Sequence, residues 1–113
     1  MAGRYDIKIL QGATFSIQLS WQDDKGQTID LNGYAVYMQI RSSLKEEVLV
    51  LELNTTNEGI TIEQNKIKIH IPATVTKDLR NIPCKYDLKL IKNDTAYRLI
   101  EGNVTISPEV TKL

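Results

Sequence analysis

Apolar and polar residues alternate along most of this 113-residue chain, and this period of two is the feature that most restricts its fold. Successive side chains of a β-strand point to opposite faces of a sheet, so the alternation predicts strands with one buried and one solvated face. The clearest run, residues 14–21, places Phe15, Ile17, Leu19 and Trp21 on its apolar face. This pattern is typical of antiparallel sheets.

Turn residues separate the alternating segments. Asn32-Gly33 and Gln64-Asn65 are typical of tight turns, and we expect Leu31 to enter the core beside the first of them. Residues 48–53 are apolar except for Glu52 and fit either a strand or a helix fragment; their β-branched residues and the turn chemistry that follows favour a strand. Strands are expected at 5–10, 14–21, 35–41, 48–53, 60–63, 66–71, 85–91, 97–101 and 103–106.

A short helical turn is expected near residues 74–81, with Thr74 or Thr76 as its N-cap and Pro83 beyond its end. About eight or nine short strands at a spacing of roughly 8–12 residues predict an all-β fold. We interpret residues 1–113 as a single antiparallel two-sheet β-sandwich domain with flexible ends at 1–3 and 109–113. The side chains expected to be buried are Phe15, Ile17, Leu19, Trp21, Val36, Met38, Ile40, Tyr86, Leu88 and Leu90.

Composition restricts the classes of partner. The 14 Lys and Arg residues balance 14 Asp and Glu residues, so the chain lacks the basic excess that indicates nucleic acid or an anionic membrane. The single cysteine, Cys84, excludes an internal disulfide and a zinc site built from several thiolates. No secretory signal is visible at the start of the sequence. We therefore expect neither nucleic acid nor membrane as a partner.

The residues that carry enzyme chemistry are few and scattered. His70 is the only histidine, and its alternation with Ile69 and Ile71 predicts an exposed strand position. Cys84 is expected to be a small buried hydrophobic residue. The acidic pairs at 23–24 and 46–47 are adjacent in sequence, so on a strand they point in opposite directions. We expect no catalytic, cofactor-binding or metal-binding residues, and hence no enzyme.

Two aromatic residues bear on the fold. Tyr86 begins a late strand after the predicted helical turn, a placement that resembles a tyrosine corner whose hydroxyl bonds back to the preceding loop. Trp21 ends the apolar face of residues 14–21, and we expect it in the core rather than on a ligand-binding surface.

Turn-and-strand patterns at residues 5–15, 20–23, 29–34, 38–41, 86–90 and 99–111 together resemble small structural proteins of tailed-bacteriophage virions. The Ile29-Asp30-Leu31-Asn32-Gly33-Tyr34 element is also similar to the N-terminal domain of phage upper-baseplate proteins. The resemblance implies an Ig-like β-sandwich in the virion, made in the host cytoplasm and associated with the tail, baseplate or neck. It implies no catalysis, and no functional residue carries over with it.

Two functions follow as hypotheses. The first is a non-catalytic virion structural subunit that contacts other tail, baseplate or neck proteins, with a homo-oligomer as an open alternative. The alternative is a module that recognises host-surface carbohydrate or protein through sandwich loops, with Tyr34, Tyr37 and Tyr97 as stacking surfaces. The positions of these tyrosines on different strands argue against the alternative.

The most apolar strand predicts an interface. Residues 48–53 are too apolar for a free sheet edge, so the strand is either central or covered by another subunit. We predict a subunit contact within residues 44–53, with the candidate interface side chains Val48, Leu49, Val50, Leu51 and Leu53.

Overall fold

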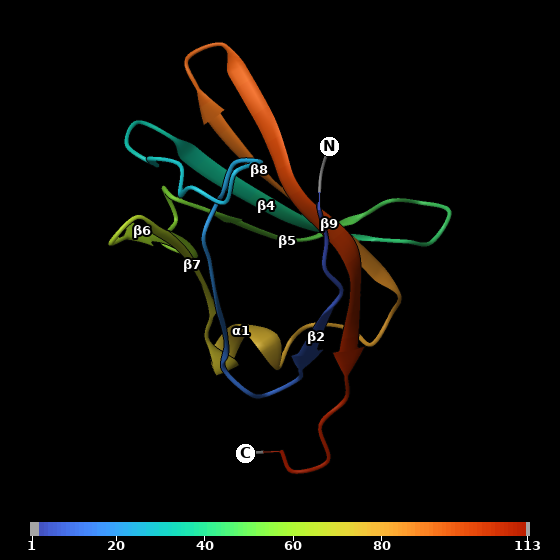
Figure 1. The fold of residues 1–113 in the computed structure, drawn as a ribbon. Helices are drawn as coiled ribbons and strands as arrows, with labels where there is room; N and C mark the ends of the chain where they lie inside the picture. Colours follow the sequence, from blue (N-terminus) through green and yellow to red (C-terminus); the bar gives the residue numbers. More distant parts are fainter. Residues whose placement is uncertain (1–2, 113) are drawn as a thin grey trace.

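The computed structural model describes residues 3–112, which form nine strands and one short helix (Figure 1). The predicted flexible ends, 1–3 and 109–113, lie partly outside this range. Within it, Gly3 pairs with Ile100, and the Glu109 N–H donates to Gln11 Oε1 at 3.0 Å. The elements are β1 Gly3–Arg4, β2 Ile7–Leu10, β3 Phe15–Leu19, β4 Ala35–Ser42, β5 Leu49–Asn54, β6 Ile60–Glu63, β7 Lys66–Ile71, α1 Ala73–Thr76, β8 Cys84–Lys92 and β9 Thr95–Ser107.

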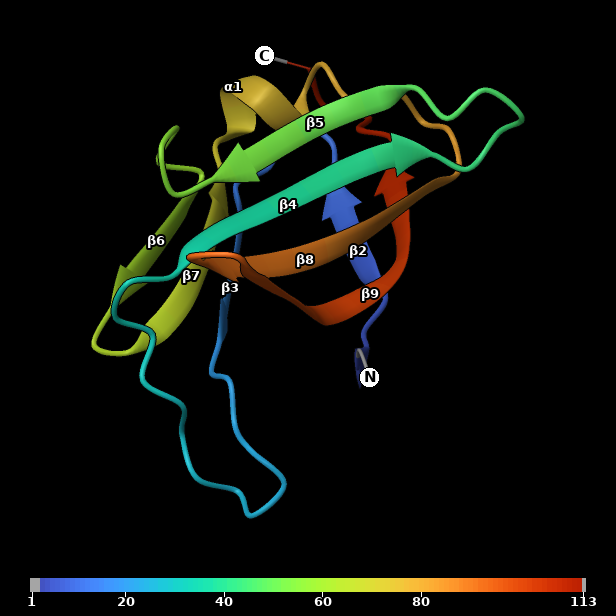
Figure 2. The same ribbon diagram turned by 90° about the horizontal axis from the view of Figure 1, so that it is seen from above.

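The strands form two sheets, which confirms the all-β prediction with two sheets. In the larger sheet the order is β9, β8, β4, β5, and β1 and β2 both pair with β9. The smaller sheet has the order β3, β7, β6. Figure 2 shows β5, β4, β8 and β9 side by side, with β6, β7 and β3 forming a separate group. The predicted strand 48–53 is β5, at the edge of the larger sheet.

The N-terminal strands differ from the prediction. Both β1 and β2 run parallel to β9, with Arg4 opposite Glu101 and Ile7 opposite Val104, so the expectation of a wholly antiparallel fold is wrong here. Parallel pairing is possible because the whole chain between β2 and β9 serves as the crossover connection. The strand expected at 5–10 begins only at Ile7, and in the segment before it Asp6 Oδ1 accepts the Asn103 N–H at 2.9 Å in place of a backbone carbonyl.

The inner faces of both sheets share one core. All the predicted core residues on β4 and β8 are buried as expected; they are Val36, Met38, Ile40, Tyr86, Leu88 and Leu90. The predicted core residues of the 14–21 run are only partly buried and pack against the margin of the core; they are Phe15, Ile17, Leu19 and Trp21. They are less buried because β3 is an edge strand of the small sheet.

Two turn predictions are confirmed. Gln64 and Asn65 connect β6 to β7 with φ values of 52° and 58°, the left-handed pair that a tight hairpin requires. Leu31 is buried beside Gly33, whose φ is +85°. Asn65 also orders this region, because its Oδ1 accepts the Leu31 N–H at 2.8 Å and its Nδ2 donates to the Ile29 carbonyl at 3.1 Å.

The helix is shorter than predicted and is not capped by a threonine. It covers only Ala73–Thr76, preceded by Pro72 at the N-cap position without a side-chain cap. Thr76 is fully buried inside the helix, and its Oγ1 donates to the Ala13 carbonyl at 2.8 Å. The hydroxyl that sequence reasoning assigned to capping instead joins the helix to the β2–β3 connection.

Tyr86 joins the N-terminal segment to the core. Its hydroxyl donates to the Tyr5 carbonyl at 2.5 Å, 81 residues away in sequence. The predicted bond to the preceding loop is therefore wrong, although the hydroxyl is satisfied by backbone. Gly102 lies opposite Tyr86 on β9, and a Cβ there would collide with the Tyr5 carbonyl oxygen. Glycine at 102 thus lets the N-terminal backbone approach within reach of Tyr86.

The partial burial of β3 yields a graded stability prediction. Leu88→Ala, at a fully buried site, should lower the free energy of unfolding by about 2–5 kcal/mol, whereas Leu19→Ala on the half-covered edge should cost less. Urea unfolding monitored by circular dichroism measures both values. Leu10→Ala, at a position 52% exposed, is the control and should change stability by no more than about 0.5 kcal/mol. Equal losses at positions 19 and 88 would contradict the assigned burial.

The Tyr86 bond yields a pH-dependent prediction. Burial, with smaller contributions from Tyr5 and Asp6, raises the pKa of Tyr86 from 10.0 to about 12. Because the folded state favours the neutral phenol, this stabilisation is complete below pH 10 and is lost as the pH rises towards 12. Tyr86→Phe should cost about 1–3 kcal/mol at neutral pH, since the Tyr5 carbonyl loses its donor. The variant should also lose less stability than the wild type between pH 10 and 12, as measured by thermal melting; parallel pH profiles would exclude this role.

Candidate functional site

The single-residue candidates are distributed over separate surfaces. His70 is exposed on β7 as predicted, and its Nδ1 lies 2.9 Å from Ser16 Oγ on the adjacent β3. Sequence reasoning missed this pair, because only the β3–β7 register places position 16 opposite position 70. Among the described residues no carboxylate contacts the imidazole, so the pair lacks the third group of a catalytic triad.

The other chemical candidates have structural surroundings. Cys84 is buried as predicted, and burial raises the pKa of its thiol, which disfavours the nucleophilic thiolate. Asp23 Oδ1 accepts the N–H groups of Lys25 and Gln27 in a turn. Among residues 3–112, no group of three His, Cys, Asp or Glu side chains is placed to hold a metal ion.

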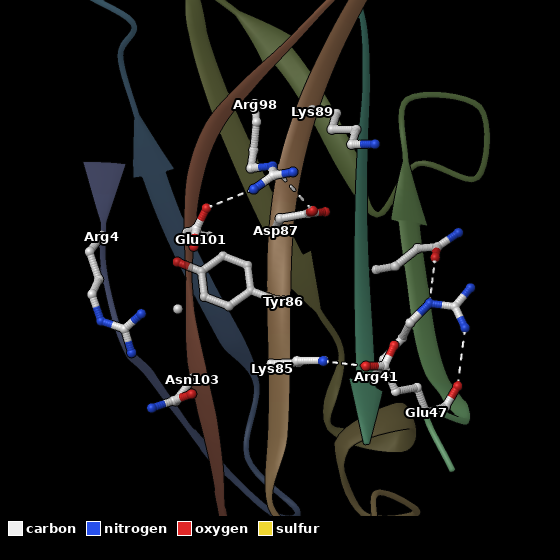
Figure 3. A pocket seen from close by; sticks show the side chains of 12 residues that line it. Arg4, Arg41, Glu47, Lys85, Tyr86, Asp87, Lys89, Arg98, Glu101 and Asn103 are labelled. Carbon is white, nitrogen blue, oxygen red and sulfur yellow. Dashed lines mark hydrogen bonds and ion pairs between the residues drawn. The ribbon is translucent and has the colours of Figure 1, made fainter. Parts of the chain in front are cut away.

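A polar concavity lies on the outer face of the larger sheet, where charged side chains of β4, β8 and β9 gather (Figure 3). Arg98 reaches two carboxylates, with Nη1 3.0 Å from Glu101 Oε1 and Nε 3.6 Å from Asp87 Oδ2. Together these carboxylates raise the pKa of Arg98, with Glu101 the stronger cause. Across the same face, the Lys85 ammonium lies 2.5 Å from Glu47 Oε1 and lowers the pKa of that carboxyl. Because these pairs lie on an exposed surface, each of them contributes little to stability.

A more distinctive surface borders β5. Leu44, Val48 and Leu49 are 52%, 59% and 44% exposed. Together with Leu79 and Ile82, they line an apolar groove of about 590 Å³, which we call the β5 groove. Exposed apolar surface gathered into a groove marks a site of interaction more often than scattered apolar residues do.

The structure reduces the number of predicted interface side chains that are exposed. Because β5 is an edge strand, the alternative of a central strand at 48–53 is excluded. Of the five candidate side chains, Val48 and Leu49 are exposed, Val50 and Leu51 are half-buried, and Leu53 is buried in the core. Side chains available to a partner are therefore concentrated at the start of the strand and in the loop before it.

The backbone edge of β5 is protected along its second half. Asn57 Oδ1 accepts the Asn54 N–H at 3.0 Å, and Asn57 Nδ2 donates to the Glu52 carbonyl at 3.0 Å. One side chain thus takes the place of a neighbouring strand. The register with β4 also shifts between Ile40 and Arg41, an irregularity of the kind that disrupts edge pairing. The accessible features of this side of the sheet are therefore the apolar side chains rather than a free strand edge along the second half of β5.

The structure also gathers aromatic residues that sequence reasoning treated as dispersed. Trp21 lies with its ring centroid 5.5 Å from that of Tyr34 and 5.2 Å from that of Tyr97. The sequence suggests Tyr34 and Tyr97 as stacking surfaces and predicts Trp21 in the core. Tyr37, the third candidate, lies apart on β4 and does not join them. No sequence pattern indicates this grouping, because the three residues come together only when the strands pair.

Protection of the β5 edge by Asn57 is testable. Asn57→Ala should lower the free energy of unfolding by on the order of 1–3 kcal/mol, because it leaves the Glu52 carbonyl and the Asn54 N–H without their partner. It should also increase concentration-dependent association by exposing a longer strand edge. Chemical unfolding and light scattering measure the two effects, with exposed Asn103→Ala as the control. Unchanged stability would contradict the bridging role.

Within residues 3–112, no helix is long and apolar enough to span a membrane. No protein-family model matches this sequence, and no curated protein matches it significantly.

Proposed function

We propose that this chain is a non-catalytic structural subunit of a tailed-phage virion, associated with the tail or baseplate, and that it assembles through the β5 groove. The resemblance of the turn-and-strand segments to small virion proteins supports the setting. The observation that supports the mode of action is the exposed apolar groove beside an edge strand.

The architecture is consistent with such a role. We interpret the two sheets, which share one core between their inner faces, as an Ig-like β-sandwich. This interpretation allows for the parallel pairing of β1 and β2 with β9. On a scaffold of this kind, edges and connecting loops carry the binding function while the core provides rigidity.

The groove offers enough surface for a contact. Fully burying a valine or leucine side chain contributes about 1.5–3 kcal/mol. Since Leu44, Val48 and Leu49 are each about half exposed, covering all three contributes on the order of 2–4 kcal/mol before the costs of association. Lys45 and Glu46 also line the groove and supply both signs of charge at its rim. An apolar centre with a polar rim is the usual anatomy of a protein–protein interface.

The partner we propose is another virion protein rather than a second copy of this chain. Self-association through β5 would most simply extend the sheet across a two-fold axis, and Asn57 already occupies part of that edge. Side-chain docking into the groove does not require a free strand edge. A homo-oligomer formed through the groove would instead be detected by its mass in solution.

The groove proposal predicts the behaviour of one double variant. Val48→Lys with Leu49→Lys places two charges in the groove at exposed positions, so it should disfavour docking while leaving the fold intact. Val110→Lys, at a position that is 95% exposed and does not line the groove, is the matched control. We expect the wild type and the control, but not the double variant, to be found by mass spectrometry in purified particles after complementation of a deletion.

Melting temperatures establish that each variant is folded, and light scattering establishes its mass in solution. If the wild type is a dimer in solution and the double variant is a monomer, the partner at the groove is a second copy of this chain and not another virion protein. Incorporation of the folded double variant at the wild-type level would exclude the groove as the assembly surface. Absence of the wild type from particles would exclude the virion role itself.

The alternative function, recognition of host-surface carbohydrate or protein, draws support from a different observation. The cluster of Trp21, Tyr34 and Tyr97 lies at the far end of β4 from the β5 groove, because Tyr34 immediately precedes β4 and Leu44 follows it. The two functions therefore do not compete for one surface.

A further inference from the structure

The cluster of Trp21, Tyr34 and Tyr97, here called the aromatic cluster, has an open side. Its ring centroids are 5.2–6.5 Å apart, and the rings are tilted or edge-on to one another. Tyr97 is nevertheless 44% exposed, and Trp21 and Tyr34 are only partly buried. If the cluster served only to close the end of the core, its outermost ring would gain by being covered.

The connection between β3 and β4 holds two of the three rings. Trp21 lies near its start and Tyr34 at its end, and Figure 2 shows this connection extending beyond both sheets. The Ile29 N–H donates to the Trp21 carbonyl at 2.7 Å, and the Tyr34 N–H donates to the Leu31 carbonyl at 3.2 Å. The bonds from Asn65 to residues 29 and 31 attach the same connection to the small sheet. These bonds hold the backbone at Trp21 and Tyr34, and pairing with Leu90 on β8 holds the backbone at Tyr97.

A lysine ammonium group lies over one ring of the aromatic cluster. Lys92 Nζ lies 5.3 Å from the ring centroid of Tyr34, within the range of a cation–π interaction. A side chain at Gly33 would press against Lys92, since a Cβ there would lie 3.2 Å from Lys92 Cε. The requirement for glycine at 33 comes from the turn, where its φ is +85°. The surfaces left open to a ligand are those of Trp21 and Tyr97.

A cavity of about 840 Å³ adjoins those two rings. Its lining combines Trp21 and Tyr97 with the side chains of Arg4, Arg98 and Glu101. Arg4 lies 3.3 Å from Asp6, and Arg98 lies 3.0 Å from Glu101, so the cations beside the cavity are already neutralised. The cavity therefore presents aromatic faces with hydrogen-bond donors and acceptors around them and little net charge.

We propose that this cavity binds a neutral pyranose sugar. A pyranose ring has a face of C–H groups that packs on an aromatic ring, and a rim of hydroxyls that exchange hydrogen bonds with guanidinium and carboxylate groups. Trp21 and Tyr97 supply the aromatic faces, and Arg4, Arg98 and Glu101 supply the polar rim. The paired charges make an acidic or phosphorylated sugar the less favoured ligand, because its anionic group would have to compete with Asp6 and Glu101 for the guanidinium groups.

This proposal goes beyond assembly and is tested independently of it. Trp21 is the only tryptophan, so its fluorescence reports on this cavity alone. We expect titration of the whole protein with glucose, galactose, N-acetylglucosamine and their β-linked trisaccharides to shift the Trp21 emission for at least one sugar. The dissociation constant for a single ring should be on the order of 1 mM.

Matched variants locate the response. Tyr97→Ala removes the exposed ring without opening the core and should weaken binding about tenfold. Tyr37→Ala removes a tyrosine that is 37% exposed outside the aromatic cluster and should change affinity by less than about twofold. Heteronuclear NMR shift mapping with the same sugars provides a second readout that does not depend on tryptophan emission. Failure of every sugar to perturb residues of the cavity by either method would overturn the proposal, and so would equal losses in the two variants.

Discussion

The packing of branched aliphatic side chains between the two sheets is the constraint on which the rest of this structure depends. Ile67, Ile69 and Ile71 on β7 are buried, as are the alternate residues of β4 and β8 on the larger sheet. Because side chains alternate, fixing these inner positions also fixes every outer position, and a slip of one residue would exchange the two sets. That register also decides which charged side chains meet on the outer face of the larger sheet and which residues lie together at the ends of its strands.

Sequence patterns correctly predicted the features that depend on residues close together in the chain. The turn at Gln64-Asn65 and the burial of Val36, Met38 and Ile40 follow from the alternation and from residues that accept left-handed backbone angles. The helix was overestimated because Thr74 and Thr76 resemble capping residues in sequence. The Thr76 hydroxyl instead bonds to Ala13, 63 residues away, and no local pattern contains that contact.

The parts that sequence reasoning did not predict depend on which strands become neighbours. The pairing of β2 with β9 joins residues 97 positions apart, and the same topology brings Asp6 to Asn103. Trp21 and Tyr34 lie at the two ends of the β3–β4 connection and Tyr97 lies on β9, so the three rings meet only after β8, β9 and β4 are aligned. Period-two alternation states which face a residue occupies but not which residue lies beside it, so the candidate sites were less predictable than the core.

The two candidate surfaces are separated by the length of β4. Its eight residues span about 26 Å at the usual rise of a strand, with Tyr34 before the first and Leu44 beyond the last. The β5 groove has exposed side chains beside a backbone edge that Asn57 partly occupies, an arrangement suited to docking a folded neighbour. The aromatic cluster has rings held by backbone bonds and opens on a cavity with paired charges, an arrangement suited to a small neutral ligand. Because no side chain lines both surfaces, a molecule docked in the groove would not contact the side chains of the cavity beside the aromatic cluster. A subunit attached to a larger assembly through one end of β4 would therefore present the other end to its surroundings.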